Sequence, residues 1–573
     1  MAFTDYIIVG GGAAGGVLAK RLAEDAEKSV VLLESGPVDD NPFIHIPVAF
    51  GKLFKTDLDY QYFTEPEPTS GNRAMFWPRA KVLGGCTSMN AMVYIRGNKG
   101  DYDRWAETTG DASLAYDADA LKYFKKAEHN ERASIRDPSM TKLHGVGGPL
   151  NVTDRVVNVI SEALLQAAVQ RGGAPFVTDL NTPEQEGIGY VQTTTKYGFR
   201  AGTARQYIRP ALAACNNLKL VTNAHVTRLV FSGDSNPTVV GVEYMDKTSK
   251  TIKTIMAKET ILCGGALNSP QLLMLSGIGP REQLEQHGIK VVVDLPAVGE
   301  NMQDHLLCSV CHEASQPVSI ALAETDAEES MRQLQLFGTG PLSSNIAEIC
   351  AFYKIRTDKI GSGGDDLFDH SLAYPTMQTH SAGSFYLEHG FKNPQPPQNP
   401  HGMFLAPGVV RPTSVGKVVL ASADPFENVK IIPNYFSTPE DINVMVNGIK
   451  LAREIYQQEA MKKYLGPEIA PGPSVQTDAQ LEEYARSFSE TIYHPTSTCK
   501  MGSSPSDSVV DTKSHRVHGV QGIRVCDASI MPDVITGNTN APTIMLAERA
   551  ADYIVKDDMI TIEKVRKTHQ FFA

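Results

Sequence analysis

The sequence has few cysteines and tryptophans and no excess of positive charge. Its 573 residues include 8 cysteines and 2 tryptophans, and 53 lysines and arginines stand against 65 aspartates and glutamates. The cysteines are scattered, without the spacing of a disulfide framework, which indicates reduced and mostly buried thiols in a reducing compartment. The net charge of −12 argues against a polyanionic partner such as nucleic acid.

Patterns of metal ligands are also missing. Cys308 and Cys311 form a single C-x-x-C pair in a run that resembles a strand, and no second pair accompanies it. His515 and His518 lie three residues apart without further ligands nearby. Because a structural zinc site needs four such ligands, we expect no metal site.

Long apolar runs are absent as well. The best candidate for a membrane span, residues 261–279, is interrupted by polar and helix-breaking residues at 268–271. At the N-terminus a charge occurs at Asp5, and the first apolar run leads directly into a cluster of glycines, unlike a secretory signal. We therefore expect a cytoplasmic protein without a transmembrane segment.

The composition that remains is that of a folded globular protein, with 42% hydrophobic and 21% charged residues. The length predicts roughly three or four domain-sized units. Short strand-like runs recur, and several end in glycine or an acid and lead into a helical pattern, which is typical of an α/β fold. These runs are residues 218–222, 227–231, 239–244, 259–262 and 522–525.

The first 35 residues read as strand, glycine turn, helix and strand. The apolar run 6–9 precedes the turn, and a second apolar run, 30–33, ends at Glu34. The turn has the spacing G-x-G-x-x-G, with glycines at Gly10, Gly12 and Gly15.

Each part of this unit has a physical reason to bind a dinucleotide. Gly10 allows a tight turn, Gly12 lets the backbone approach a pyrophosphate, and Gly15 lets helix and strand pack closely. The helix N-terminus offers free N–H groups to the phosphates. Glu34 would accept hydrogen bonds from a ribose diol and repel a 2′-phosphate. The unit predicts a Rossmann-like dinucleotide site, but the spacing does not separate FAD from NAD.

The middle of the chain differs from its ends. Alternating runs such as 349–354 and 417–420 predict an antiparallel sheet, and the run 522–527 with the helical pattern 543–554 predicts a return to the first domain. The overall class is α/β, or α+β over the whole chain, with a discontinuous substrate domain of antiparallel sheet and helices. We expect residues 1–154, 195–307 and 497–573 to form the cofactor domain, and residues 155–194 and 308–496 the substrate domain.

Three further segments make the prediction specific: residues 81–97, residues 264–279, and the C-terminal pair 493–502 with 527–543. Together with the N-terminal unit, they resemble the glucose–methanol–choline (GMC) family of flavoprotein alcohol oxidoreductases, from about residue 4 to about residue 555. The subgroup most similar is that of the choline-dehydrogenase-like alcohol dehydrogenases and oxidases.

The resemblance implies FAD and assigns residues to it. The ADP half matches Gly10, Gly12, Ala13, Ala14, Gly15 and Glu34. The turn that lines the flavin matches Gly84, Gly85, Asn90, Ala91, Met92 and Val93. Val226 matches the position whose backbone meets the adenine, Asp527 and Ala528 match the pair beside the ribityl chain and pyrophosphate, and Asn540 and Thr543 match positions near the isoalloxazine.

The resemblance also implies the catalytic residues. His494 matches the catalytic base, Asn538 matches the second catalytic position, and Tyr493 is an aromatic neighbour of the substrate. The chemistry agrees, because an alcohol must lose its hydroxyl proton and histidine has a pKa near the operating pH. An asparagine amide can stabilise developing alkoxide charge.

Two departures from the family pattern refine this hypothesis. Some relatives bind the flavin covalently through a histidine just before the motif asparagine, and here Met89 occupies that position, so we expect non-covalent FAD. The two tryptophans, Trp77 and Trp105, lie in the N-terminal region, away from the half that would enclose a quaternary ammonium group. The expected substrate is an uncharged primary alcohol, apolar or aromatic.

Other readings remain open at this stage. A flavin-containing hydroxynitrile lyase or a non-catalytic FAD-binding protein would share the fold. Fatty-acid photodecarboxylases lack the histidine and carry a cysteine before the Arg-Pro of the active-site strand, whereas here Val410 precedes Arg411. We expect reoxidation by oxygen or a quinone-like acceptor, and a monomer or homodimer.

Overall fold

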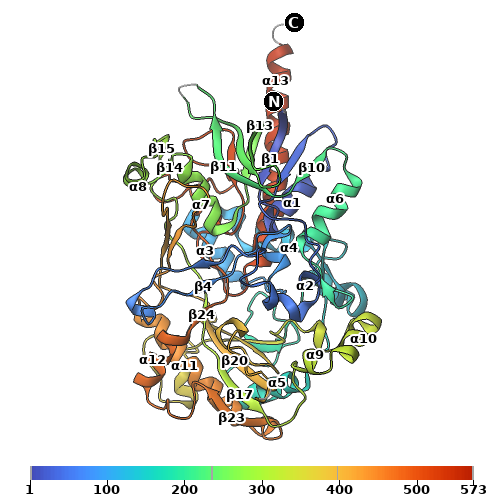
Figure 1. The fold of residues 1–573 in the computed structure, drawn as a ribbon, viewed down its shortest axis with the longest axis vertical. Coiled ribbons are helices and arrows are strands. Elements are labelled where there is room, and N and C mark those ends of the chain that lie inside the picture. The colour runs from blue at the N-terminus through green and yellow to red at the C-terminus, as the bar shows by residue number, and fades with distance from the viewer. Residues whose placement is uncertain (1–2, 234–235, 396–397, 571–573) are drawn as a thin grey trace.

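The computed structural model describes residues 3–233, 236–395 and 398–570, with side chains described up to residue 557. Two large β-sheets lie one above the other along the long axis of the molecule (Figure 1). The upper sheet carries the N-terminal strand, and the lower sheet is built from the middle of the chain. This mixed architecture confirms the predicted fold class.

The first sheet has seven strands in the order β10-β2-β1-β13-β12-β11, with β25 paired to β13. Its centre is parallel, and β11, β12 and the start of β13 form an antiparallel ribbon. The strands are β1 (Phe3–Val9), β2 (Val30–Leu33), β10 (Leu218–Val221), β11 (Ala224–Phe231), β12 (Val239–Asp246), β13 (Thr251–Leu262) and β25 (Ile523–Val525).

Helix α1 (Ala13–Ala23) packs closely on β1 because Gly15 has no side chain. A Cβ at Gly15 would lie 1.9 Å from the carbonyl oxygen of Gly10. The other side of α1 contacts the long C-terminal helix α13 (Asn540–Gln570). The predicted strand–turn–helix–strand unit is therefore present, and its return segment lies beside it.

The second sheet is antiparallel throughout, with the order β23-β17-β20-β19-β18-β7 and with β16 and β24 added through β20. Helices α5 (Val159–Arg171) and α11 (Pro439–Tyr456) pack against it, and α12 (Asp478–Phe488) packs on α11. The strands are β7 (Gly187–Tyr190), β16 (Leu306–Leu307), β17 (Val310–Ala314), β18 (Ile349–Tyr353), β19 (Met377–Ala382), β20 (Gly402–Val409), β23 (Leu465–Ala470) and β24 (Glu490–Thr491).

The run 417–420 does not join this sheet. It forms β21 (Lys417–Val419), which pairs with β22 (Lys430–Ile432) in a separate ribbon. The remaining strands are β3 (Tyr62–Phe63), β4 (Phe76–Trp77), β5 (Glu128–Asn130), β6 (Leu150–Val152), β8 (Thr195–Lys196), β9 (Phe199–Arg200), β14 (Ile278–Gly279) and β15 (Val293–Asp294). The remaining helices are α2 (Pro42–His45), α3 (Lys99–Thr109), α4 (Leu121–Ala127), α6 (Arg209–Ala214), α7 (Gly265–Leu275), α8 (Arg281–Gln286), α9 (Leu322–Thr325) and α10 (Ala327–Phe337).

We propose the division of the chain into domains from the membership of these sheets. Residues 155–194 contribute β7 to the second sheet and α5 to the helices that pack on it, and residues 308–496 contribute most of the other strands. Strand β16 (Leu306–Leu307) also pairs there, so the crossing into the second unit lies at about Leu306.

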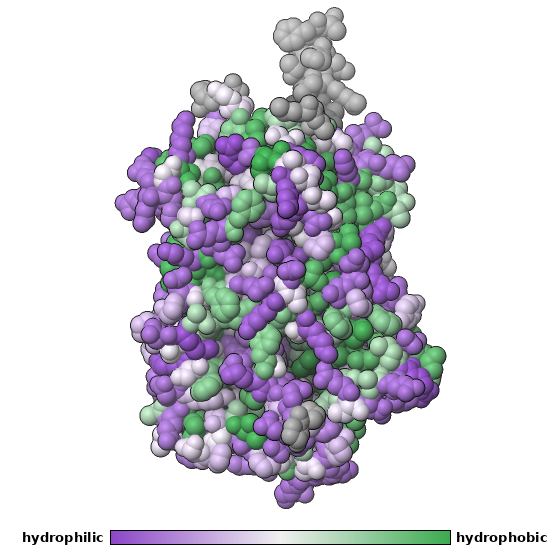
Figure 2. Space-filling model, viewed as in Figure 1, coloured by the Kyte–Doolittle hydropathy of each residue, from purple (hydrophilic) through white to green (hydrophobic). Residues whose placement is uncertain are grey.

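The described residues hold no group of three or more histidines, cysteines or acids able to bind a metal ion. All eight cysteines are free thiols, and Cys308 and Cys311 are buried at the start of the second sheet. Within the described part of the chain, no helix is both long and apolar enough to cross a bilayer. Figure 2 shows hydrophilic residues spread over both halves of the visible face.

Candidate active site

A deep cavity extends from the β1–α1 turn to the second sheet, with about 1870 Å³ of empty space including its open mouth. Its lining joins the glycine turn after β1 to His494 and Asn538 in a single cavity. This arrangement suits an elongated cofactor with a small substrate at one end. The predicted residues that line it are Gly10, Gly12, Ala13, Ala14, Glu34, Gly85, Asn90, Ala91, Met92, Val93, Val226, Tyr493, His494, Asp527, Ala528, Asn538, Asn540 and Thr543.

Two predicted residues, Gly15 and Gly84, act behind the lining. Gly15 lets α1 approach β1, as described above. Gly84 adopts φ +91°, and a Cβ there would lie 2.3 Å from Ser88 Oγ. Both glycines therefore shape the two turns that line the cavity without lining it themselves.

The end of the cavity at the β1–α1 turn is formed largely by main-chain atoms of glycines. Gly10 adopts φ +107°, and a Cβ at Gly85 would lie 2.7 Å from Gly12 Cα. Helix α1 begins directly after Gly12, so its unpaired N–H groups face this end of the cavity. An anionic pyrophosphate fits such a site, because the helix N-terminus attracts negative charge.

Glu34 follows the end of β2 and lines the same cavity as His225 and Val226. Its Oε2 accepts a hydrogen bond from the Gly11 N–H at 2.9 Å, and its Oε1 accepts one from the Gly36 N–H at 2.8 Å. Burial raises the pKa of this carboxyl to about 7. A carboxylate oxygen can accept more than one hydrogen bond, so this group suits a ribose diol as a further donor.

Asp527 is held at the end of β25 by its own chain. Its Oδ2 accepts hydrogen bonds from the Gly265 N–H at 2.8 Å and Ser269 Oγ at 2.6 Å, and its Oδ1 accepts one from the Ser529 N–H at 2.8 Å. Burial raises its pKa. The side chain therefore joins the start of α7 to the C-terminal return segment, directly on the cavity wall.

His494 and Asn538 meet at the opposite end of the cavity. Asn538 Nδ2 lies 3.3 Å from His494 Nε2, and both residues line the cavity. Because an amide N–H only donates, Nε2 must accept, so it carries a lone pair. Burial, assisted by the neighbouring His305, His380 and Arg79, holds the pKa of His494 well below its ordinary value. The ring is thus neutral and available as a base.

Two residues that the sequence did not single out hold His494 in place. Asp304 Oδ1 accepts a hydrogen bond from the His494 N–H at 2.7 Å, and His305 Nδ1 lies 3.0 Å from His494 Nδ1. Asp304 is itself held by Thr491 Oγ1 at 2.6 Å and by the Tyr435 hydroxyl. Asp304 and His305 belong to a loop before β16, and no periodic sequence pattern identifies a functional residue there.

The walls around His494 are apolar and aromatic. Phe50, Phe54 and Met89 line this end, and the rings of Phe54 and Tyr493 lie 5.8 Å apart at 62°. The Tyr493 hydroxyl contacts His389 Nδ1 at 2.7 Å. Among the described residues that line the cavity, the carboxylates are Glu34 and Asp527, both away from this end.

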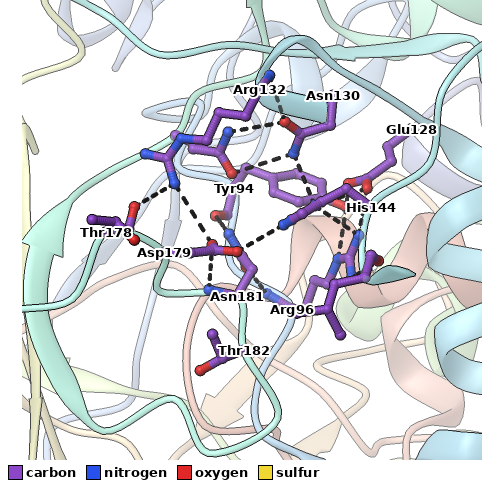
Figure 3. Close-up of polar contacts among 12 residues, drawn as sticks. Tyr94, Arg96, Glu128, Asn130, Arg132, His144, Thr178, Asp179, Asn181 and Thr182 are labelled. Carbon is purple, nitrogen blue, oxygen red and sulfur yellow. Dashed lines mark hydrogen bonds and ion pairs between the residues drawn. The ribbon is translucent and has the colours of Figure 1, made fainter. Parts of the chain in front are cut away.

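A buried polar cluster lies directly after the lining segment 90–93 (Figure 3). Arg96 pairs with Glu128, and the Arg96 N–H donates to Asn181 Oδ1 at 2.9 Å. His144 contacts Glu128 Oε1 at 3.0 Å and Asp179 Oδ2 at 2.8 Å. The cluster ties the end of the lining segment to three distant parts of the chain.

Comparison with known proteins agrees with this geometry. The N-terminal GMC oxidoreductase family model matches residues 4–307, and the C-terminal model matches residues 412–547. The chain is 40% identical to an alcohol dehydrogenase [acceptor] of Pseudomonas putida, over 98% of this chain and 97% of that one. It is 39% identical to human mitochondrial choline dehydrogenase, over 96% and 89% of the two chains.

Solved structures give the same result. Pyridoxine 4-oxidase from Mesorbium loti superposes with a TM-score of 0.83 and 28% identity, over 96% of this chain and 98% of that chain. Formate oxidase superposes with a TM-score of 0.88 and 25% identity, over 97% and 98%. The predicted family is confirmed: the chain belongs to the GMC oxidoreductases.

Proposed function

We propose that this protein oxidises a primary alcohol to the aldehyde with FAD as its cofactor, and that His494 and Asn538 are its catalytic pair. The observation that carries the proposal is the 3.3 Å contact between Asn538 Nδ2 and His494 Nε2 at the wall of the cavity that the glycine turn after β1 also lines. A donor and an acceptor this close can both bind one hydroxyl group.

The mechanism follows from these two atoms. The substrate oxygen accepts a hydrogen bond from Asn538 Nδ2, while its hydroxyl proton passes to the lone pair of His494 Nε2. The amide donor stabilises the negative charge that develops on the oxygen. FAD, when bound, supplies the acceptor for the hydride that leaves the alcohol carbon. The apolar walls exclude water and keep the alcohol at this spot.

Members of this family are FAD proteins, and the residues of this chain fit the cofactor. The glycines of the β1–α1 turn, the N-terminus of α1, Glu34 and Val226 suit the ADP half, and Asn540 lies at the other end with Thr543. For the attachment, we propose non-covalent FAD because Met89, a residue that forms no flavin bond under ordinary conditions, lines the cavity at the position used for tethering. Acid precipitation should release all the flavin into the supernatant.

The substrate class follows from the walls around His494. Phe50, Phe54 and Tyr493 offer aromatic surface, and the charged lining residue nearest Tyr493 is Arg79, whose guanidinium donates to the Tyr493 carbonyl. Tryptophan binds a quaternary ammonium best, and neither Trp77 nor Trp105 is among the lining residues, while the lining acids lie at the other end. We therefore favour an uncharged apolar or aromatic alcohol over choline, although choline dehydrogenases are among the relatives.

The test is anaerobic reduction of the bound flavin by a panel of alcohols. We expect bleaching by aromatic or apolar primary alcohols, and His494→Ala should slow it by about 10²–10⁴-fold while FAD remains bound. A lyase or a structural FAD protein would show no bleaching with any alcohol. Bleaching at the wild-type rate in His494→Ala would show that another group is the base.

The same panel identifies the electron acceptor. Peroxide formation in air would indicate oxygen, and turnover only with an artificial dye would indicate a quinone-like carrier. The names of the relatives include both kinds, an alcohol dehydrogenase [acceptor] and oxygen-dependent choline dehydrogenases. A cytoplasmic location and a monomeric or homodimeric state complete the proposal.

A further inference from the structure

Gln378 is a fully buried amide in the second sheet, outside the cavity lining, that contacts Asn538 of the proposed catalytic pair. It lies on β19, in register with Gly408 of β20. Its Nε2 donates a hydrogen bond to Asn538 Oδ1 at 3.1 Å. Its Oε1 has no hydrogen-bond partner among the described residues, which is a cost that a purely structural glutamine would avoid.

The contact fixes which way the Asn538 amide points. Because Gln378 Nε2 is a donor, Asn538 must present its oxygen to it, and the Asn538 nitrogen then faces His494 Nε2. If the Asn538 amide turned over, its oxygen would face His494 and would favour a proton on Nε2. In that arrangement the proposed base has no lone pair for the substrate.

A thiol and a histidine behind Gln378 favour the same orientation. Cys350 Sγ lies 3.5 Å from Gln378 Nε2 and 3.2 Å from His380 Nδ1. Burial raises the pKa of Cys350 to about 12, so it remains a thiol that can donate to His380. The sulfur then receives the second N–H of Gln378 as an acceptor.

At the other end of this series of hydrogen bonds, His305 contacts the second ring nitrogen of His494. With Nε2 of His494 occupied as an acceptor, the ring proton lies on Nδ1 and points to His305 Nδ1 at 3.0 Å. Burial lowers the pKa of His305 to about 3, so it is neutral and can accept this proton as a hydrogen bond. Donors and acceptors therefore alternate from the Cys350 thiol to Nδ1 of His305.

We propose that Gln378 is a positioning residue that sets the tautomer of His494 through Asn538. It touches neither substrate nor cofactor, and its role is to keep the Nε2 lone pair of His494 directed at the cavity. The inference rests on the proposed function, since it assumes that His494 is the base.

The first test replaces the amide by an apolar side chain of similar length, Gln378→Met, in the FAD-loaded enzyme. The Asn538 amide then loses the hydrogen bond that fixes its orientation, so we expect flavin reduction to slow by about tenfold or more. Ring-nitrogen NMR of the holoenzyme reports the tautomer of His494, whose signals are assigned by difference against His494→Ala. In the wild type we expect one tautomer, with no proton on Nε2, and in Gln378→Met a mixture of the two. Wild-type reduction with an unchanged tautomer would overturn the proposal.

The second test is Gln378→Glu, which should respond to pH in a new way. A neutral carboxyl group can donate to Asn538 Oδ1, but its ionised form only accepts and would turn the Asn538 amide over. We expect activity to fall as pH rises through the raised pKa of this buried carboxyl, whereas wild-type activity rises and levels off as His494 loses its proton. A profile without this descending limb would contradict the proposal.

The matched control is Gln192→Met. Gln192 is an equally buried amide that hydrogen-bonds to Asn130, away from His494. This substitution should lower the stability of the protein but leave the pH profile of activity and the tautomer of His494 unchanged. Failure of the proposed function has a different signature: His494→Ala would reduce flavin at the wild-type rate, while the NMR of the unmutated enzyme would still report the His494 tautomer.

Discussion

Single residues in this protein have their chemistry set by burial together with backbone donors. Glu34 is an example, because its two oxygens are held by the Gly11 and Gly36 N–H groups while burial raises its pKa to about 7. Ribose hydroxyls that donate to this carboxyl would stabilise its ionised form. Binding of FAD should therefore lower the pKa of Glu34 and release a proton.

This coupling predicts a pH-dependent affinity. In the wild-type apoprotein, FAD should bind more tightly as pH rises through about 7. Glu34→Gln should weaken binding by about 2 kcal/mol, or about 30-fold, above that pH and remove the pH dependence. Titration of apoprotein with FAD, followed by flavin fluorescence, measures both. The exposed Glu65→Gln serves as control, and an equal pH dependence in Glu34→Gln would rule out the ribose role.

At the scale of elements, α1 and α13 are held together by a buried carboxylate as well as by apolar packing. Glu548 on α13 is fully buried and accepts two hydrogen bonds from the Arg21 guanidinium of α1, at 2.8 and 2.9 Å. Lys126 of α4 lies 3.3 Å from the same carboxylate. Residues more than 500 positions apart are joined here, at the C-terminal end of the helix whose N-terminus would face the pyrophosphate.

Removing this charge should destabilise the cofactor domain. Glu548→Gln leaves Arg21 and Lys126 without their buried counter-charge, so we expect the free energy of unfolding to fall by about 3 kcal/mol. Urea denaturation of the holoenzyme measures the change. The control is Glu24→Gln, because Glu24 binds the same Arg21 from an exposed position, where such pairs contribute less than about 1 kcal/mol. Equal effects of the two changes would contradict this assignment.

For the molecule as a whole, the cavity is assembled from segments that the chain visits repeatedly, and buried polar clusters fix them to one another. His144 is central to the cluster of Figure 3, between Glu128 and Asp179, with Arg96 close by. Burial and Arg96 lower the pKa of His144, but hydrogen bonds to Asp179 and Glu128 outweigh them, and the pKa is raised.

A raised histidine pKa gives stability that depends on pH with a defined sign. The contribution is fully present below the unfolded value of about 6.5 and is lost as pH rises through the higher folded value. The thermal midpoint of the holoenzyme should therefore decline over that window, and His144→Asn should remove this part of the slope. His129→Asn is the neighbouring control, and a slope unchanged in His144→Asn would show that His144 is not its source.

The strand–turn–helix–strand unit of the proposed cofactor site was predictable from sequence because its signals are local. The apolar strand, the spaced glycines and Glu34 lie within one continuous stretch, and each backbone requirement selects a residue type. The segments around Asn90, His494 and Asp527 were instead assigned through the resemblance to the GMC family, and the structure places all three on one cavity. What these residues do in catalysis stays a prediction until the variants are measured.

The tertiary structure alone decided how His494 is supported. Asp304, His305 and Gln378 come from a loop and a central strand, far from His494 in sequence, and buried polar residues at such places follow no periodic pattern. The roles of these residues depend on distances and on which atom donates, and only the folded arrangement of these segments sets both. The sequence by itself determined the strand–turn–helix unit that would hold the nucleotide, because that unit needs only neighbours along the chain.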